Sequence, residues 1–193
     1  MEFTNITELH KHYNEQIDLP IKKNATQAVF GNGHPKSPIV FIGEAPGKSE
    51  DKEGDPFIGV AGKFLNEMLG TIGLKREDIY ITNIVKYRPP DNRDPEPDEK
   101  KACAPWLYAE LNFIAPKLII FLGRHSMNDF FPDLKISEVH GKLIHKKFNH
   151  IDTEYFLPLY HPASALYNGG MRQTLINDFA KIPAILKKIE GEN

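Results

Sequence analysis

The chain has 193 residues, 26% of them charged and 40% hydrophobic, as in ordinary soluble globular proteins. Its formal net charge of −2 argues against a globally basic nucleic-acid-binding protein, so a polyanion would have to bind a local patch. The single cysteine, Cys103, excludes an intramolecular disulfide and an all-cysteine metal cluster within one chain. No secretory signal and no apolar run near the ~20 residues of a membrane span occur. We therefore expect a cytoplasmic, single-domain monomer with no membrane partner.

The predicted elements begin with a polar region that leads into the fold. Residues 1–16 have apolar side chains at helical spacing, which predicts a helix docked on the body. Residues 17–37 contain prolines and glycines and predict an extended segment. The first strand covers residues 39–42, a short β-branched and aromatic run that ends at Gly43.

Strands and helices alternate over the rest of the chain. Prolines are concentrated in residues 86–98, and a loop of this kind inside a compact domain is usually functional or a covering element. Asp98 is predicted to cap the helix that follows it. The alternation predicts right-handed crossovers and a parallel sheet flanked by helices. In chain order we expect helix 61–69, strand 79–83, a helix after 98, strand 118–123, a short helix 126–131, strand 154–160 and a last helix 171–188.

Three predicted strands finish on a polar residue. Glu44 follows the first strand, Asn83 ends the second and His161 follows the fourth. Because the carboxyl ends of parallel strands share one edge of a sheet, these three side chains should converge there. Each alone has a simpler explanation, since Glu44 could be solvated, Asn83 could satisfy a turn and His161 could bind backbone. Together with Phe57 on a Pro-Phe-Ile-Gly loop, they indicate a functional site.

The residues around these strand ends form a series of short motifs. In chain order they are Gly-Glu-Ala-Pro-Gly (43–47), Glu-Asp (50–51), Pro-Phe-Ile-Gly (56–59), Ala-Gly-Lys-Phe-Leu (61–65), Thr-Asn-Ile-Val-Lys (82–86), Arg-Pro-Pro-Asp-Asn-Arg (88–93), Pro-Asp-Glu (97–99), Ile-Ala-Pro-Lys-Leu-Ile-Ile-Phe-Leu-Gly (114–123) and His-Pro-Ala-Ser-Ala-Leu (161–166). In unbroken order over residues 28–186, they resemble the motifs of the family-four uracil-DNA glycosylases. The resemblance implies an α/β fold, a three-layer α/β/α sandwich with a central four-stranded parallel sheet. It also implies one domain over residues 1–193, with a lead-in at 1–37 and a core at 38–188.

The sequence departs from this family at the cysteines. The family usually carries a four-cysteine [4Fe–4S] cluster, with ligands near the amino-terminal segment, in the Lys-Cys-Arg-Pro-Pro loop and in the helix beyond. Here Tyr87 stands in that loop, residues 16–23 contain no cysteine, and Cys103 alone is at a ligand-like position. One thiolate cannot hold a cluster that needs four ligands. We therefore predict a member with no cofactor, in which Tyr87 and Leu19 fill the space and Cys103 is a small buried hydrophobic residue.

The resemblance assigns roles in base recognition. A base must leave the stack of duplex DNA to be reached. Phe57 would stack on the flipped uracil ring. Asn83 would accept from uracil N3–H and donate to O4, whereas cytosine reverses both demands and would leave buried groups unpaired.

The resemblance also assigns the chemistry. His161, assisted by backbone N–H groups around Ala45, would stabilise the uracil anion at O2. Glu44 would orient the attacking water or stabilise the developing positive charge on the sugar. Asp51 is a second carboxylate candidate for substrate binding, although capping of its loop explains it equally well. No metal is needed.

Contacts with DNA are expected from the loop after His161 and from scattered cations. Leu166 could wedge into the gap left by the extruded nucleotide, or it could be a core leucine that opens the last helix. Phosphate contacts are expected from Ser164, Arg88 and Arg93, and from Lys142, Lys146 and Lys147. Residues 135–150 carry four lysines against one Glu, a modest basic patch. The histidines at 125, 140, 145 and 150 lack a ligand spacing and are interpreted as surface or structural.

The leading hypothesis is a monofunctional DNA glycosylase that excises uracil from DNA to start base-excision repair. The alternative is a protein that binds uracil-containing or abasic DNA with little or no turnover. A related branch retains DNA covalently through a histidine in a loop after the second motif, but residues 86–98 contain no histidine. A small-molecule hydrolase on the same fold would leave Phe57, Asn83 and His161 unexplained together. Strand preference and the acceptance of thymine, hypoxanthine or xanthine stay open.

Overall fold

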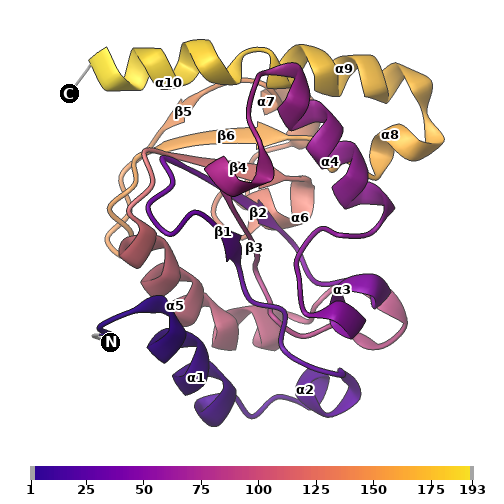
Figure 1. Ribbon diagram of the computed structural model, residues 1–193, viewed down its shortest axis with the longest axis vertical. Helices are drawn as coiled ribbons and strands as arrows, with labels where there is room; N and C mark the ends of the chain where they lie inside the picture. The colour runs from indigo at the N-terminus through magenta and orange to yellow at the C-terminus, as the bar shows by residue number, and fades with distance from the viewer. Residues whose placement is uncertain (1–2, 192–193) are drawn as a thin grey trace.

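A computed structural model describes residues 3–191 of the chain. Its centre is a six-stranded sheet with the order β1-β3-β2-β4-β6-β5 (Figure 1). Strand β2 pairs in parallel with β3 and with β4, and β4 pairs in parallel with β6. Short strands β1 and β5 add to the two edges in antiparallel orientation. The strands are β1 (Asn32–Gly33), β2 (Ile39–Gly43), β3 (Tyr80–Asn83), β4 (Leu118–Leu122), β5 (Ile144–His145) and β6 (Tyr155–Leu159).

Helices cover both faces of this sheet (Figure 1). Every residue of β2, β3 and β4 is buried, as expected for parallel strands covered on both faces. Alternate side chains of β2 enter different cores: Val40 and Ile42 join a cluster with α1 and α5, whereas Ile39 and Phe41 join one with α4, α9 and α10. The helices are α1 (Ile6–Gln16), α2 (Pro20–Asn24), α3 (Lys48–Glu53), α4 (Val60–Thr71), α5 (Pro97–Ile114), α6 (Arg124–Asn128), α7 (Ile136–Val139), α8 (Ser164–Tyr167), α9 (Gly169–Phe179) and α10 (Ile182–Gly191).

The structure differs from the sequence-based expectations in local details. Two edge strands of two residues each were not predicted, so the sheet has six strands rather than four. The segment 17–37, expected to be extended, contains α2 and β1. Glu96 rather than Asp98 is the N-cap of α5: its backbone N–H donates to Glu99 Oε2 at 2.8 Å, and Pro97 is the first residue of the helix.

The expected last helix, 171–188, is divided into separate pieces. The Asn168 side chain accepts from the backbone N–H of Gly170 and so caps a new helix, α9. Pro183 is the second residue of α10, a position where its missing N–H costs nothing, but it could not continue an unbroken helix. Among residues 3–191, no helix combines the length and the apolar character that a membrane span requires.

Candidate functional site

The carboxyl ends of the four parallel strands lie along one side of the sheet, which is the edge meant from here on. A polar side chain stands at or just after the end of each of these strands. Gly43 of β2 pairs in register with Asn83 of β3, and Glu44 is the next residue after Gly43. His161 follows β6, and His125 lies in the first turn of α6 directly after β4. The sequence predicted three of these four positions. It missed His125 because Gly123 and Arg124 separate this residue from the apolar run of β4.

A small cavity lies at this edge, with a volume of about 190 Å³. Phe57, Asn83 and His161, three of the residues singled out from the sequence, line it together. The other lining residues are Ala45, Gly47, Glu50 and Ala61. The cavity is smaller than the ~300–1,000 Å³ of drug-sized pockets, so it suits a single planar ring.

Phe57 is held in an unusual backbone conformation. Its φ is 54°, in the left-handed region that non-glycine residues rarely adopt, and its side chain is buried. Arg76 donates from Nη1 to the Phe57 carbonyl oxygen at 2.9 Å. Glu50 Oε1 accepts from the backbone N–H groups of Ile58 and Gly59 at 3.0 and 2.8 Å. These contacts fix the loop that points the aromatic ring into the cavity.

Asn83 has a buried amide oxygen without a partner. The residue is 1% exposed, and its Oδ1 has no hydrogen-bond partner among residues 3–191. Its backbone carbonyl is held by Lys86 Nζ at 2.9 Å, and Lys86 also forms a buried ion pair with Glu110 at 2.7 Å. Since a buried acceptor is costly to leave unpaired, the amide is poised to receive an N–H from a ligand.

His161 is arranged as a neutral hydrogen-bond donor. The backbone N–H of Ala163 donates to Nδ1 at 3.1 Å, so in the neutral ring the proton is on Nε2. Burial lowers the pKa of His161 to about 4; the nearby His125 also lowers it, and Glu50 opposes this shift. The imidazole is therefore uncharged at neutral pH. Its ring centroid lies 5.7 Å from that of Phe57.

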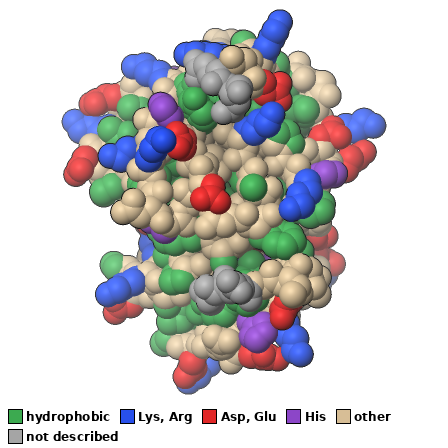
Figure 2. Space-filling model, turned by 90° about the vertical axis from the view of Figure 1, so that its left-hand side faces the viewer, with side chains coloured by type: hydrophobic (Ala, Val, Ile, Leu, Met, Phe, Trp, Pro, Cys, Tyr) green, Lys and Arg blue, Asp and Glu red, His purple; other side chains and the backbone are tan. Residues whose placement is uncertain are grey.

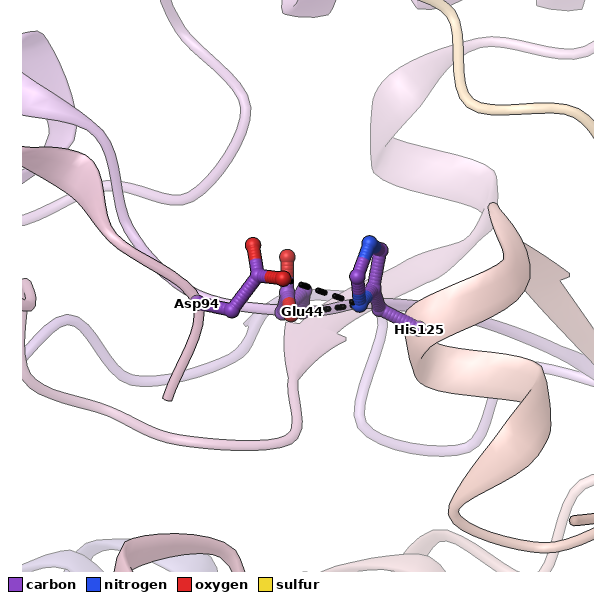
Figure 3. Close-up of side chains that lie close together, drawn as sticks. All are labelled: Glu44, Asp94 and His125. Carbon is purple, nitrogen blue, oxygen red and sulfur yellow. Dashed lines mark ion pairs between the residues drawn. The ribbon is translucent and has the colours of Figure 1, made fainter. Parts of the chain in front are cut away.

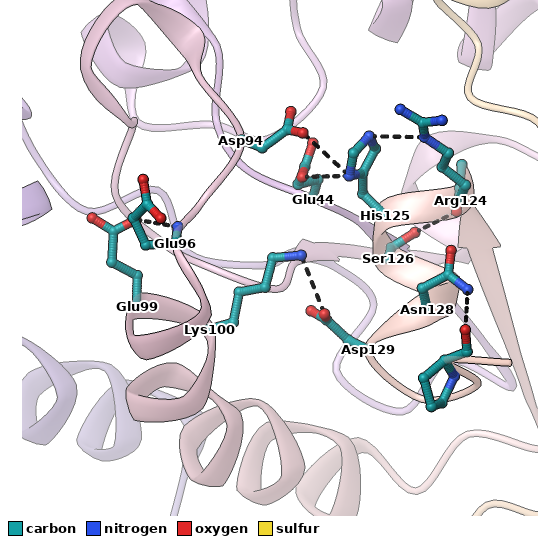
Figure 4. A network of polar contacts seen from close by, with 12 residues as sticks. Glu44, Asp94, Glu96, Glu99, Lys100, Arg124, His125, Ser126, Asn128 and Asp129 are labelled. Atoms are coloured by element: carbon teal, nitrogen blue, oxygen red, sulfur yellow. Dashed lines mark hydrogen bonds and ion pairs between the residues drawn. The ribbon is translucent and has the colours of Figure 1, made fainter.

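Glu44 faces a second, adjoining cavity of about 370 Å³, which shares His161 with the first. Burial raises the pKa of the Glu44 carboxyl, His125 opposes this shift, and Asp94 adds to it. Figures 3 and 4 show Glu44 beside His125 and Asp94, and Figure 4 shows the Lys100–Asp129 ion pair close by. The second cavity is also lined by Leu122, Gly123, Arg124, Ile136, Tyr160 and Ser164.

Glu44, Asp94 and His125 each offer one ligand atom, and these atoms lie within 4.8 Å of one another. Two carboxylates and an imidazole could in principle hold a metal ion. However, Arg124 Nε donates to His125 Nε2 at 3.1 Å, which brings a guanidinium charge up to the group. We interpret the group as an imidazole in contact with two carboxylates, with Arg124 on the other side of the ring.

The structure places Asp51 outside the lining of both cavities. Its two carboxylate oxygens accept from the backbone N–H and the hydroxyl of Thr26, each at 2.8 Å. This arrangement favours the alternative in which Asp51 fastens its own segment to the chain before β2. Glu50, its neighbour in sequence, lines the small cavity instead.

The expected DNA contacts do not all lie together: Ser164, Leu166, Arg88 and Arg93 belong to the segment after His161 and to the loop 86–96, whereas Lys146 and Lys147 lie beside Glu154 at the start of β6. Ser164 lines the second cavity and donates to the His161 carbonyl oxygen at 2.7 Å, and the Leu166 side chain is 41% exposed. Arg88 donates to Asn92 Oδ1. Arg93 makes a two-pronged contact with Glu99, at 2.9 and 2.8 Å, so a phosphate would have to compete with this carboxylate.

The residues near Cys103 do not fit an iron–sulfur cluster. Cys103 is 1% exposed, burial raises the pKa of its thiol, and its Sγ lies 3.2 Å from the Tyr13 hydroxyl. Tyr87 stacks on Tyr13 and donates to Asn14 Oδ1 at 2.8 Å. Leu19 packs half-buried against the same cluster. Aromatic and aliphatic side chains therefore surround the single thiol.

Comparison with known proteins gives consistent results. A family model described as "Uracil DNA glycosylase superfamily" matches residues 30–184. A type-4 uracil-DNA glycosylase of Sulfurisphaera tokodaii is 50% identical over 163 residues, covering 81% of this chain and 74% of that protein. A type-4 enzyme of Archaeoglobus fulgidus is 44% identical over 178 residues, covering 87% and 86%. One of Thermotoga maritima is 39% identical over 173 residues, covering 88% of each.

Proposed function

Because this chain belongs to the uracil-DNA glycosylase superfamily, we propose that it hydrolyses the N-glycosidic bond of deoxyuridine in DNA and so starts base-excision repair. The observation that carries this proposal is the buried, unpaired Oδ1 of Asn83 in a cavity that also contains the Phe57 ring and the His161 imidazole. An apolar slot with one amide edge fits a flat heterocycle that offers an N–H beside a carbonyl group. Uracil has this pattern at N3 and O4.

Base selection then follows from hydrogen-bond pairing. Asn83 accepts from uracil N3–H through Oδ1 and donates to O4 through its amino group. Cytosine presents an acceptor at N3 and a donor at N4, so both groups of the Asn83 amide would stay unpaired in a dry cavity. Leaving buried polar groups unpaired in this way discriminates strongly against the mismatched base. Phe57 supplies stacking that is common to all bases.

The chemistry divides between the two cavities. As the C1′–N1 bond breaks, its electron pair goes to uracil, and the resulting anion is stabilised by the Nε2–H of His161 and by backbone N–H groups around Ala45. A neutral imidazole serves here because it donates a hydrogen bond without losing its proton. Glu44, on the sugar side, stabilises the cationic sugar and orients the water that adds to C1′. Asp51 is not needed in this scheme.

DNA is proposed to lie over the edge where the parallel strands end. Leu166, in α8 shortly after His161 in the chain, is exposed and so is available to fill the gap left by the flipped nucleotide. Ser164, Arg88 and Arg93 are proposed phosphate contacts, and Arg124 of the second cavity is a further one. On the side where β6 begins, Lys and Arg are interspersed with Asp and Glu (Figure 2), so that face has no single-sign surface for DNA.

The proposed enzyme is a cytoplasmic monomer of one domain that works without a metal or an iron–sulfur cluster. Its function is tested with a labelled single-uracil oligonucleotide in excess over protein, read after alkaline cleavage. We expect multiple turnovers on the uracil strand and none on the matching cytosine strand. A retained complex without turnover would instead favour the binding protein, and cleavage of free deoxyuridine would favour a small-molecule hydrolase.

A further inference from the structure

His125 closes the set of polar residues at the ends of the four parallel strands. It stands in α6 directly after β4, and Gly123, at a φ of 100°, makes the turn that brings it to the site. Its Nδ1 lies 3.2 Å from Glu44 Oε1 and 3.6 Å from Asp94 Oδ2, both within ion-pair distance. Figure 3 shows the imidazole edge facing the two carboxylates.

Arg124 determines which nitrogen of the His125 imidazole carries the proton. Its Nε donates to His125 Nε2 at 3.1 Å, so Nε2 is an acceptor and the ring proton is on Nδ1. The Nδ1–H is therefore on the side of the carboxylates, 3.2 Å from Glu44 Oε1, a buried oxygen that has no hydrogen-bond partner among residues 3–191. The guanidinium on the other side of the ring polarises the imidazole toward these carboxylates. Arg124, His125 and Glu44 form a chain in which positive charge is presented to the carboxylate of Glu44 (Figure 4).

Glu44 needs such a partner because its surroundings oppose ionisation. Burial raises the pKa of its carboxyl, and the negative charges of Asp94 and Asp129 act in the same direction. His125 and Lys100 act in the opposite direction, with His125 the larger of the two. These groups come from the 86–96 loop, α5 and the segment after α6, and His161 faces His125 from the end of β6.

We propose that His125 is a positioning residue that holds Glu44 as an oriented carboxylate at the site, with Arg124 fixing the tautomer that this requires. The inference rests on the proposed glycosylase function, since Glu44 is the group on the sugar side of that reaction. His125 is not among the residues that line the base cavity. Its contribution is therefore expected in the chemical step and not in recognition of uracil.

The first test compares His125→Ala and His125→Asn with the wild-type chain. The Asn amide nitrogen can replace Nδ1 as a donor, whereas Ala cannot. We expect His125→Ala to lower the single-turnover excision rate about tenfold, a coupling typical of residues in contact, with little change in KM. His125→Asn should recover most of this loss. The acid limb of the pH–rate profile should move to higher pH in His125→Ala, because Glu44 loses the group that favours its charged form.

His145→Ala is a matched control for this test, and a Glu44→Gln variant shows whether His125 acts through Glu44. His145 pairs with Glu154 at 2.9 Å at the opposite end of β6, so His145→Ala removes the same kind of pair away from the site. It should leave the rate and the profile unchanged. In a Glu44→Gln background, His125→Ala should cause no further loss. A full tenfold loss in that background, or equal losses for Ala and Asn, would overturn the positioning role.

A measurement independent of activity separates this inference from the proposed function. Titration of the Glu44 side-chain carboxyl by carbon-13 NMR should show a higher pKa in His125→Ala than in the wild type, with no change in His145→Ala. If the wild-type chain excises no uracil, the proposed function is contradicted, while this titration still tests the pairing. An unchanged Glu44 titration in His125→Ala would overturn the inference.

Discussion

Asn83 occupies the space that a side chain on Gly43 would need. The two residues are register partners on β2 and β3. A methyl group on Gly43 would lie 2.5 Å from Phe57 Cζ and closer still to Asn83 Oδ1. The absence of a side chain at one strand end therefore permits the amide and the aromatic ring of the cavity to approach each other.

Gly43→Ala should accordingly disable excision while the fold persists. We expect a loss of at least about a hundredfold, because small displacements of positioned groups have effects of this size, and a stability loss of about 1–3 kcal/mol from overpacking. Single-turnover kinetics and urea unfolding measure the two effects. Gly70→Ala is the matched control, since nothing lies within 4 Å of its added methyl group. A Gly43→Ala chain with wild-type kinetics would contradict the geometry of the cavity.

Asn83→Asp should reduce uracil excision by orders of magnitude at neutral pH. A carboxylate can accept from N3–H but repels O4, and burying its charge in the cavity is unfavourable. The measurement is the excision rate on uracil and on cytosine oligonucleotides. Asn177→Asp, at an exposed position of α9, should change neither rate. Uracil excision at the wild-type rate by Asn83→Asp would refute the assigned role.

The sequence reveals the main elements of this fold because its strands are short, apolar and separated by helical stripes. It does not reveal β1 or β5, since two-residue edge strands such as Asn32–Gly33 have no periodic pattern. It also extends the last helix through Pro183, because the apolar stripe continues across the break. The edge strands depend on pairing with distant strands, and the break in the last helix depends on local capping. Neither of these leaves a mark in the spacing of apolar residues.

Phe57 is visible through its Pro-Phe-Ile-Gly motif, and the other residues of the candidate site are visible where a strand ends at or just before them. Asn83 and Glu44 satisfy this condition, and His161 is two residues beyond β6. The sequence alone leaves His125 as a surface or structural histidine, because Gly123 and Arg124 separate it from the apolar run of β4. Asp51 and Glu50 are adjacent in the sequence, and only the direction of each side chain in α3 decides which one lines the cavity.

The neutral state of His161 predicts a specific pH dependence of stability. Its pKa is about 4 in the folded chain against 6.5 for a free side chain. The unfolded chain therefore binds a proton that the folded chain does not, and stability falls as the pH decreases from 6.5 toward 4. Over this pH interval the free energy of unfolding of His161→Gln should fall by about 1–3 kcal/mol less than that of the wild type. Urea unfolding at several pH values measures the difference; parallel curves for the two chains would rule it out.

The surroundings of Cys103 predict a protein without iron. The purified chain should be colourless, contain no stoichiometric iron, and keep full excision activity after treatment with chelators. Cys103→Ala should lower the free energy of unfolding by about 1–2 kcal/mol, because packing and the contact with the Tyr13 hydroxyl are lost. The same variant should excise uracil at the wild-type rate. Iron analysis, visible absorbance and thermal unfolding provide the readouts. Visible iron–sulfur absorbance in the native protein would contradict the prediction.

The buried pair of Lys86 and Glu110 should couple the stability of the fold to the position of Asn83. Lys86 and Glu110 side chains are 4% and 1% exposed. Burial raises the pKa of the Glu110 carboxyl, but the charges and hydrogen bonds of Lys86 and His10 together lower this pKa to about 2. Since the folded pKa lies below the unfolded value of 4.5, the stabilisation is present above 4.5 and lost as the pH falls toward 2.

Glu110→Gln should therefore destabilise the chain by about 3–5 kcal/mol, because it leaves the Lys86 ammonium buried without a counter-charge. Lys86→Met in the same chain removes that charge and should restore much of the stability. The double variant should still excise uracil slowly, because the Asn83 carbonyl then lacks the Lys86 donor that holds it at 2.9 Å. Urea unfolding and single-turnover excision on the single and double variants separate the two effects. Recovery of both stability and excision in the double variant would show that Lys86 does not position Asn83.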